Sequence, residues 1–139
     1  MVPSAIMADV QHNIVEYLRS VFSPYMIIVF GSFAKGAARA DSDVDVAIYD
    51  DGEYSAYEFF MAAQELAGII GRDVDLINLK SASTVMKAQI VGYGKVIFCS
   101  NDNRRQWFFM RTFREYAQLN EDREPILRKI REGRSIYGE

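Results

Sequence analysis

The chain has 139 residues and a net charge of −3, and half of its residues are hydrophobic. These values are typical of one globular domain and exclude the strongly basic face of a nucleic-acid-binding protein, so we expect no direct nucleic-acid binding. The single cysteine, Cys99, excludes an internal disulfide, and with only one histidine present the usual zinc ligand sets are excluded as well. Any bound metal would therefore be a hard cation held by carboxylates.

Targeting signals are also missing from the sequence. No segment approaches the ~20 apolar residues of a membrane span, and the first residues lack the basic and apolar stretches of a signal peptide. With the lone cysteine, this predicts a soluble cytoplasmic protein without membrane association. We expect Cys99 itself to be a small core residue at the end of a strand.

Helices and strands alternate along the first hundred residues. Apolar residues at steps of three and four predict an amphipathic helix over residues 5–21, and the apolar run 25–30 predicts a buried strand that stops at Gly31. Residues 43–49 alternate as a strand does, so that Asp43, Asp45, Ala47 and Tyr49 share one face, opposite Val44, Val46 and Ile48. The further predicted elements are a helix over 54–70 with Gly71 as its C-cap, a strand over 73–79, a helix from Ser81 or Ser83 to about Val91, and a short strand over 96–99.

The last forty residues differ in character from the rest. Two helices are predicted, over 104–119 and 122–136, with their apolar side packed on the body of the protein. The expected architecture is α/β (α+β), with a small mixed sheet of about four strands flanked by helices. We expect residues 1–100 to form the core and residues 101–139 a helical appendage of the same domain.

The segment GSFAKGAARADSDVD, residues 31–45, combines several features of a phosphate site. Gly31 allows a sharp turn and close approach of a ligand because it has no Cβ. Ser32 opens a short helical turn, where its hydroxyl and free backbone N–H groups can hold phosphate oxygens. Lys35 and Arg39 add positive charge nearby. The segment therefore predicts binding of a phosphate-containing ligand.

Three strand-borne carboxylates accompany this turn. Asp43 and Asp45 project to the same side of their strand, and Asp75 lies on the matching face of the next strand. Carboxylates brought this close repel one another unless they are solvated or a cation lies between them. Asp43, Asp45 and Asp75 together predict a site for one or two Mg²⁺ ions that also carry water and phosphate ligands.

This pattern resembles the signature of the polymerase-beta-type nucleotidyltransferase superfamily, which is Gly-Ser, ten residues, then Asp-x-Asp. Within it, the short chain is similar to the minimal nucleotidyltransferases, which are antitoxins paired with HEPN-domain ribonuclease toxins. The resemblance covers about residues 25–99 and includes RDVDLINLKSASTVMKAQIVGYGKVIF. It implies the polymerase-beta-like fold, with Gly31, Ser32 and Lys35 binding nucleotide. Lys35 stands where the family often has arginine.

By position, the resemblance makes Asp43, Asp45 and Asp75 the catalytic, metal-binding residues. It places Asp75 as the carboxylate beside the acceptor hydroxyl, and Asp73 is the competitor for that role. It also implies ATP as substrate with two Mg²⁺ ions as cofactor.

The implied reaction is transfer of AMP to a tyrosine of a cognate HEPN toxin, with which the chain would form a hetero-oligomer. Two alternatives stay open at this point. The protein could be an aminoglycoside-type adenylyltransferase, for which the forty residues after Asp102 provide little room for a substrate domain. It could also be an antitoxin that acts only by binding.

Overall fold

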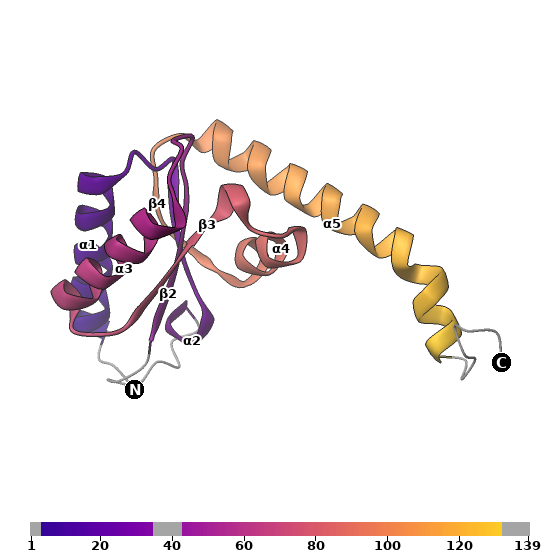
Figure 1. Ribbon diagram of the computed structural model, residues 1–139, viewed down its shortest axis with the longest axis horizontal. Helices are drawn as coiled ribbons and strands as arrows, with labels where there is room; N and C mark the ends of the chain where they lie inside the picture. Colours follow the sequence, from indigo (N-terminus) through magenta and orange to yellow (C-terminus); the bar gives the residue numbers. More distant parts are fainter. Residues whose placement is uncertain (1–3, 35–42, 132–139) are drawn as a thin grey trace.

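The computed structural model describes residues 4–34 and 43–131, which form one mixed sheet with helices on both faces (Figure 1). The strands are β1 (Met26–Phe30), β2 (Val44–Tyr49), β3 (Val74–Asn78) and β4 (Lys95–Cys99). The helices are α1 (Ser4–Val21), α2 (Gly31–Ala34), α3 (Ala56–Ile70), α4 (Thr84–Tyr93) and α5 (Asp102–Arg131), with a short 3₁₀ turn η1 (Leu79–Ser81). The predicted α/β (α+β) architecture with four strands is confirmed.

The sheet order is β3-β2-β1-β4, so β3 and β4 are the outer strands. β1 pairs antiparallel with both β2 and β4, whereas β2 and β3 are parallel. Parallel neighbours need a crossover connection, and α3 provides it between β2 and β3. This crossover brings the ends of two strands that are distant in sequence to the same end of the sheet.

Each face of the sheet has its own hydrophobic core. Val44, Val46 and Ile48 of β2 pack in the cluster that includes residues of α1 and α3. Ala47 and Tyr49 belong to the opposite cluster, together with residues of α4 and α5. The alternation predicted for residues 43–49 is therefore confirmed, and it places Asp45 on the face shared by α4 and α5.

The cap residues fix where the crossover helix begins and ends. Ser55 caps α3 and forms a capping box with Glu58, in which each side chain accepts from the other residue's backbone N–H. Gly71 ends the helix in the left-handed conformation, as predicted. Of the two serines considered for α4, Ser83 is the N-cap and accepts from the Met86 N–H at 3.1 Å.

One prediction for the C-terminal region is wrong, because the two expected helices are a single helix, α5, of 30 residues. The helix runs through Pro125, which lacks one N–H donor but does not end it. Ion pairs one turn apart, Arg111–Glu115 at 2.9 Å and Arg128–Glu124 at 3.9 Å, support it along its exposed surface. Across residues 4–34 and 43–131, no helix combines the length and apolar character needed to cross a bilayer.

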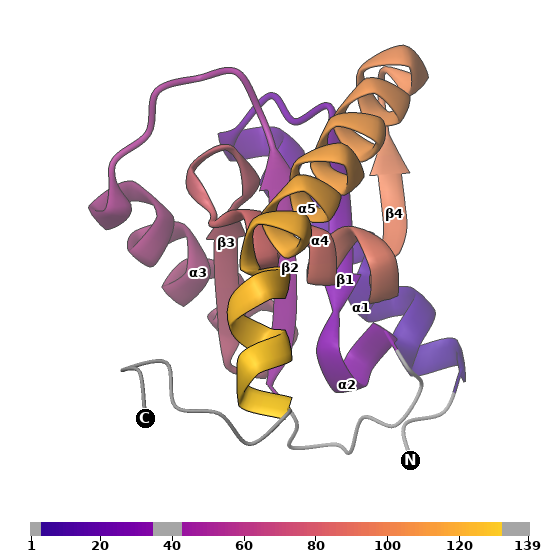
Figure 2. The same cartoon turned by 90° about the vertical axis from the view of Figure 1, so that its right-hand side faces the viewer.

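Helix α5 crosses the sheet obliquely, and its C-terminal half extends away from the body (Figures 1 and 2). The expectation that its apolar side chains pack on the body holds for Phe108, which is buried, but is wrong for Trp107, Phe113 and Ile130. Trp107 and Phe113 are about half exposed although their neighbours Phe108 and Thr112 are buried, so they lie on a side of the helix that does not pack on the body; Ile130 lies in the part of α5 that extends away from it. Cys99 is exposed at the end of β4, so the prediction that it is a core residue is also wrong.

Candidate active site

The turn between β1 and α2 brings the backbone against a carboxylate. Gly31 has a φ of 71°, the left-handed region that favours glycine. A Cβ at this position would overlap Oδ2 of Asp45 and lie 3.4 Å from its Cγ. The absence of a side chain at Gly31 therefore makes room for the Asp45 carboxylate beside the start of α2. Ser32 follows and is exposed at this turn.

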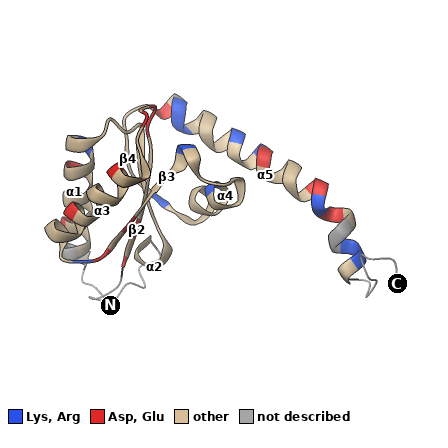
Figure 3. Ribbon diagram, viewed as in Figure 1, with Lys and Arg blue, Asp and Glu red and all other residues tan. Residues whose placement is uncertain are grey.

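Asp45 and Asp75 are register partners in the parallel pair of β2 and β3. Neighbouring strands lie about 4.8 Å apart and paired side chains stand on the same face, so the two carboxylates are adjacent. Asp43 precedes β2 and is exposed. Figure 3 shows acidic positions at these ends of β2 and β3, next to α2. The structure thus brings together the residues that the sequence singles out on two separate strands.

The electrostatics of Asp45 reflect this crowding. Partial burial raises the pKa of the Asp45 carboxyl above its usual value, and the negative charges of Asp75 and then Asp43 raise it further. Asp45 therefore gives up its proton less readily than an isolated aspartate would. A cation placed among these groups would offset both effects.

Asp73, the alternative third carboxylate, occupies a different position. It lies just before β3, where its backbone carbonyl accepts a hydrogen bond from the Val44 N–H at 2.9 Å. Its charge is not among those that raise the pKa of Asp45, whereas that of Asp75 is. Asp75 is therefore the carboxylate of β3 that lies beside Asp45 and raises the pKa of its carboxyl.

The residues present fit a magnesium ion that is shared with a substrate phosphate. Mg²⁺ is commonly held by one or two carboxylates, with water and phosphate oxygens completing an octahedron. Asp45 and Asp75 supply such a pair, and Asp43 adds charge beside it. Within the described ranges, no three His, Cys, Asp or Glu side chains form a ready metal-binding group. The arrangement suits an open site rather than a closed protein cage.

Two basic residues predicted near the phosphate turn, Lys35 and Arg39, lie outside the described residues. Another carboxylate of this region, Asp50, has a structural role at the opposite end of β2. It is buried and accepts hydrogen bonds from the Ser23 N–H at 2.7 Å and the Gly52 N–H at 2.8 Å. These bonds hold the turn after β2, so Asp50 is separate from the candidate site.

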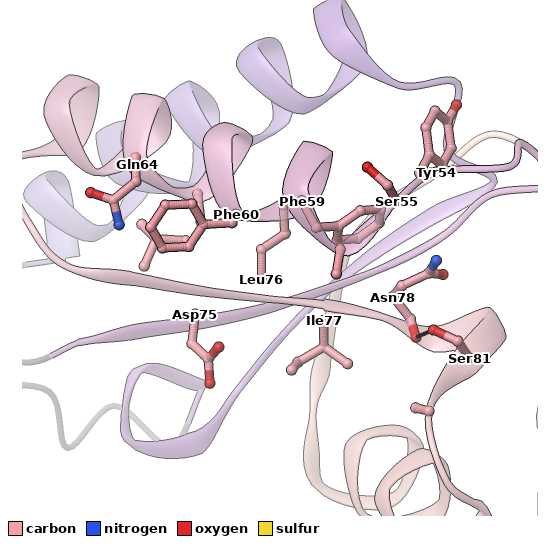
Figure 4. A pocket seen from close by; sticks show the side chains of 14 residues that line it. Tyr54, Ser55, Phe59, Phe60, Gln64, Asp75, Leu76, Ile77, Asn78 and Ser81 are labelled. Carbon is pink, nitrogen blue, oxygen red and sulfur yellow. Dashed lines mark hydrogen bonds between the residues drawn. The ribbon is translucent and has the colours of Figure 1, made fainter.

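The structure contains a groove beside Asp75 that the sequence pattern does not predict. This groove has a volume of about 580 Å³ and lies between α3 and β3, and Asp75 is one of its lining residues (Figure 4). Apolar side chains of α3, including Phe59 and Phe60, form one wall. In the sequence, Phe59 and Phe60 have the pattern of ordinary helix residues. The groove beside them is open because β3 is the outer strand of the sheet and has no further strand next to it.

Comparison with known proteins is consistent with this geometry. Residues 12–103 match the family described as "Polymerase beta, Nucleotidyltransferase". The chain belongs to this nucleotidyltransferase family. The match contains β1, the Gly31–Ser32 turn and all three aspartates, so the family assignment covers the whole candidate site.

Curated relatives of this nucleotidyltransferase carry a more specific description. A protein named "Protein adenylyltransferase MntA" from Shewanella oneidensis is 30% identical over 118 residues, which are 84% of each chain. A protein of the same name from Thermococcus cleftensis is 37% identical over 75 residues, covering 50% of this chain and 76% of the relative.

Solved structures agree in fold over most of the nucleotidyltransferase. A toxin–antitoxin crystal structure with AMP-PNP has a TM-score of 0.79 and 30% identity, covering 86% of this chain and 97% of the other. A structure of the tri-AMPylated Shewanella oneidensis HEPN toxin in complex with MNT antitoxin matches with a TM-score of 0.77 and 27% identity. It covers 89% of this chain and 98% of that one. The predicted polymerase-beta-like fold is confirmed.

Proposed function

We propose that this protein is an antitoxin adenylyltransferase that moves AMP from ATP to a tyrosine hydroxyl of a cognate HEPN-domain toxin. The observation that most strongly supports this proposal is the register pairing of Asp45 with Asp75 beside the Gly31–Ser32 turn. Relatives named as protein adenylyltransferases, and a solved complex of an AMPylated HEPN toxin with MNT antitoxin, support the choice of acceptor. The protein would act in the cytoplasm as a hetero-oligomer with its toxin.

The site's residues divide into a nucleotide part and an acceptor part. Gly31 and Ser32 would hold the β- and γ-phosphates of ATP through backbone N–H groups and the serine hydroxyl. Lys35, proposed from sequence, would add a charge contact to the same phosphates. The α-phosphate would then lie next to Asp45, and Asp75 would face the acceptor hydroxyl from the adjacent strand.

In the proposed reaction, the tyrosine oxygen attacks the α-phosphorus of ATP. A bond forms between these two atoms, the bond from the α-phosphorus to the bridging oxygen breaks, and pyrophosphate leaves. The carboxylate of Asp75 accepts the phenolic proton and passes it to water. Asp43, Asp45 and Asp75 would hold Mg²⁺, which when bound lowers the pKa of the acceptor hydroxyl and neutralises charge on the leaving group.

The test uses the purified protein, the product of the neighbouring gene, ATP and Mg²⁺. Intact-mass measurement of the partner should show an increase of one or more AMP units. The double variant Asp43→Asn/Asp45→Asn should give no increase. If the partner's mass does not change, yet both wild type and double variant protect cells from it, neutralisation occurs by binding alone. If ATP is consumed only with an aminoglycoside, the protein is a small-molecule adenylyltransferase.

A matched pair of variants tests the assignment of the third carboxylate. Asp75→Asn should lower AMP transfer about 100-fold or more, because it removes the carboxylate that accepts the proton of the acceptor hydroxyl. Asp73→Asn is the control, since it makes the same chemical change two residues earlier on an exposed side chain. A greater loss for Asp73→Asn than for Asp75→Asn would overturn the assignment.

A further inference from the structure

The outer edge of β3 presents backbone groups that no other strand uses. β3 is the last strand of the sheet on one side. The Asp73 carbonyl accepts a hydrogen bond from the Val44 N–H of β2. Because the N–H and C=O groups of successive residues point to alternate sides of a strand, the backbone groups of Asp73, Asp75 and Ile77 point toward β2. Val74 and Leu76 therefore turn their N–H and C=O groups outward. Within the part of the chain that the structure describes, no backbone hydrogen bond satisfies these outward groups.

This edge forms the floor of the 580 Å³ groove beside α3. In Figure 4, Phe59, Phe60 and Leu76 lie on the α3 side of β3, whereas Asp75 points to the opposite face, where the nucleotide is proposed to bind. Phe60 borders the groove and is 58% exposed, so its ring is accessible to a ligand in the groove. Asp75 is the only charged residue among those lining the groove.

We propose that this groove binds an extended segment of the acceptor protein, which pairs with β3 as a fifth strand and carries the acceptor tyrosine to Asp75. The inference rests on the proposed function and adds the means by which the acceptor is recognised. An extended segment is the ligand that satisfies outward-facing strand groups, because main-chain hydrogen bonds provide affinity and the groove selects side chains. The groove and the reaction site meet at β3, because Asp75 lines the groove and its carboxylate points to the opposite face.

The geometry of strand addition matches the needs of the reaction. A strand added to β3 lies about 4.8 Å away, and its residue opposite Asp75 stands on the same face as that carboxylate. The aligned positions would then be Asp45 on β2, Asp75 on β3 and the tyrosine on the added strand. The nearly uncharged groove favours an acceptor segment with apolar residues at the alternate positions, which would contact Phe60.

Amide hydrogen exchange followed by NMR tests the pairing directly. In the free protein the Val74 and Leu76 amides should exchange quickly, and the Asp75 and Ile77 amides slowly, because only the latter point toward β2. Addition of the partner without ATP should slow the Val74 and Leu76 amides by at least about tenfold, as expected for newly formed ladder hydrogen bonds. Unchanged exchange at both amides in the complex would overturn the proposal. Slow exchange in the free protein that speeds up on dilution would show a second copy of this chain on the edge, and would overturn it as well.

A matched pair of variants on α3 tests the groove by activity. Phe60→Ser should raise the KM for the partner about tenfold, because an apolar contact is lost on binding, and should leave kcat and ATP affinity unchanged. Ile69→Ser is the control, since Ile69 is 50% exposed on the same helix and does not line the groove. Equal KM values for the two variants would contradict the proposal. If the wild-type protein transfers no AMP at all, the proposed function fails; if it transfers AMP but both groove tests are negative, only the groove inference fails.

Discussion

Substitution of Gly31 by alanine tests the link between the β1–α2 turn and the Asp45 carboxylate. Alanine at φ 71° carries a backbone penalty of about 1–2 kcal/mol. The new Cβ would also overlap Oδ2 of Asp45, and forcing that side chain from its rotamer costs about 0.5–1.5 kcal/mol more. Gly31→Ala should therefore lower the free energy of unfolding by about 1.5–3.5 kcal/mol, the sum of these two estimates.

Gly71→Ala separates the two contributions. Gly71 has a φ of 70°, but nothing lies within 4 Å of a Cβ built there. It should therefore show the backbone penalty alone, about 1–2 kcal/mol, as measured by urea unfolding. AMP transfer should fall about 100-fold in Gly31→Ala, since a displacement of about 1 Å at a reacting group has that effect. Activity should stay near wild type in Gly71→Ala.

A double variant completes the cycle. In a protein that already carries Asp45→Ala, the overlapping carboxylate is absent. Adding Gly31→Ala to that protein should therefore lower the free energy of unfolding only as much as Gly71→Ala lowers it in the wild type. Full AMP transfer in Gly31→Ala would contradict a link between this turn and the site. An equal stability loss at Gly31 with and without the Asp45 carboxylate would contradict the overlap of the two groups.

The remaining predictions concern charge, pH and the attachment of α5. Asp75→Asn should raise the unfolding free energy by about 0.5 kcal/mol while it lowers activity, because it relieves repulsion with Asp45; a loss of stability in urea unfolding would contradict this. Burial and a hydrogen bond to Glu65 raise the pKa of Tyr17 to about 12. As the pH rises, the unfolded state therefore loses this proton before the folded state does. The free energy of unfolding should fall between about pH 10 and 12, and Tyr17→Phe should make this fall smaller in unfolding curves. The Arg104 guanidinium lies 4.5 Å from the centre of the Tyr25 ring and 2.7 Å from Asp51. Arg104→Lys should therefore lower the melting temperature more than Arg128→Lys, which changes an ion pair with Glu124 on the exposed part of α5. Equal shifts would contradict a stacking role for Arg104.

Much of the site follows from local patterns in the sequence. The alternation of residues 43–49 places Asp45 opposite the large apolar residues of β2, and the structure has the same two faces. Gly31 is predictable as a turn because it follows an apolar run, and Gly71 as a cap because it ends an amphipathic helix. These features depend on residues close in sequence, for which side-chain periodicity and backbone sterics are decisive.

What the sequence does not specify depends on contacts between distant segments. The pairing of Asp45 with Asp75, rather than Asp73, is fixed by the strand register, and a shift of two residues would keep every side chain on its face. The exposure of Trp107 beside the buried Phe108 depends on which side of α5 packs on the body, and the continuity of α5 through Pro125 is likewise not specified by the local pattern. The outer position of β3, and with it the groove, depends on the order of strands in the sheet.

The central claim is that the aspartates beside the Gly31–Ser32 turn form a magnesium–nucleotide site. Calorimetric titration of the protein with a non-hydrolysable ATP analogue, with and without Mg²⁺, tests this most directly. We predict binding that requires Mg²⁺ and that weakens strongly in Asp45→Asn, while Asp73→Asn binds like the wild type. Nucleotide binding that is absent, or equal with and without Mg²⁺, would contradict the account.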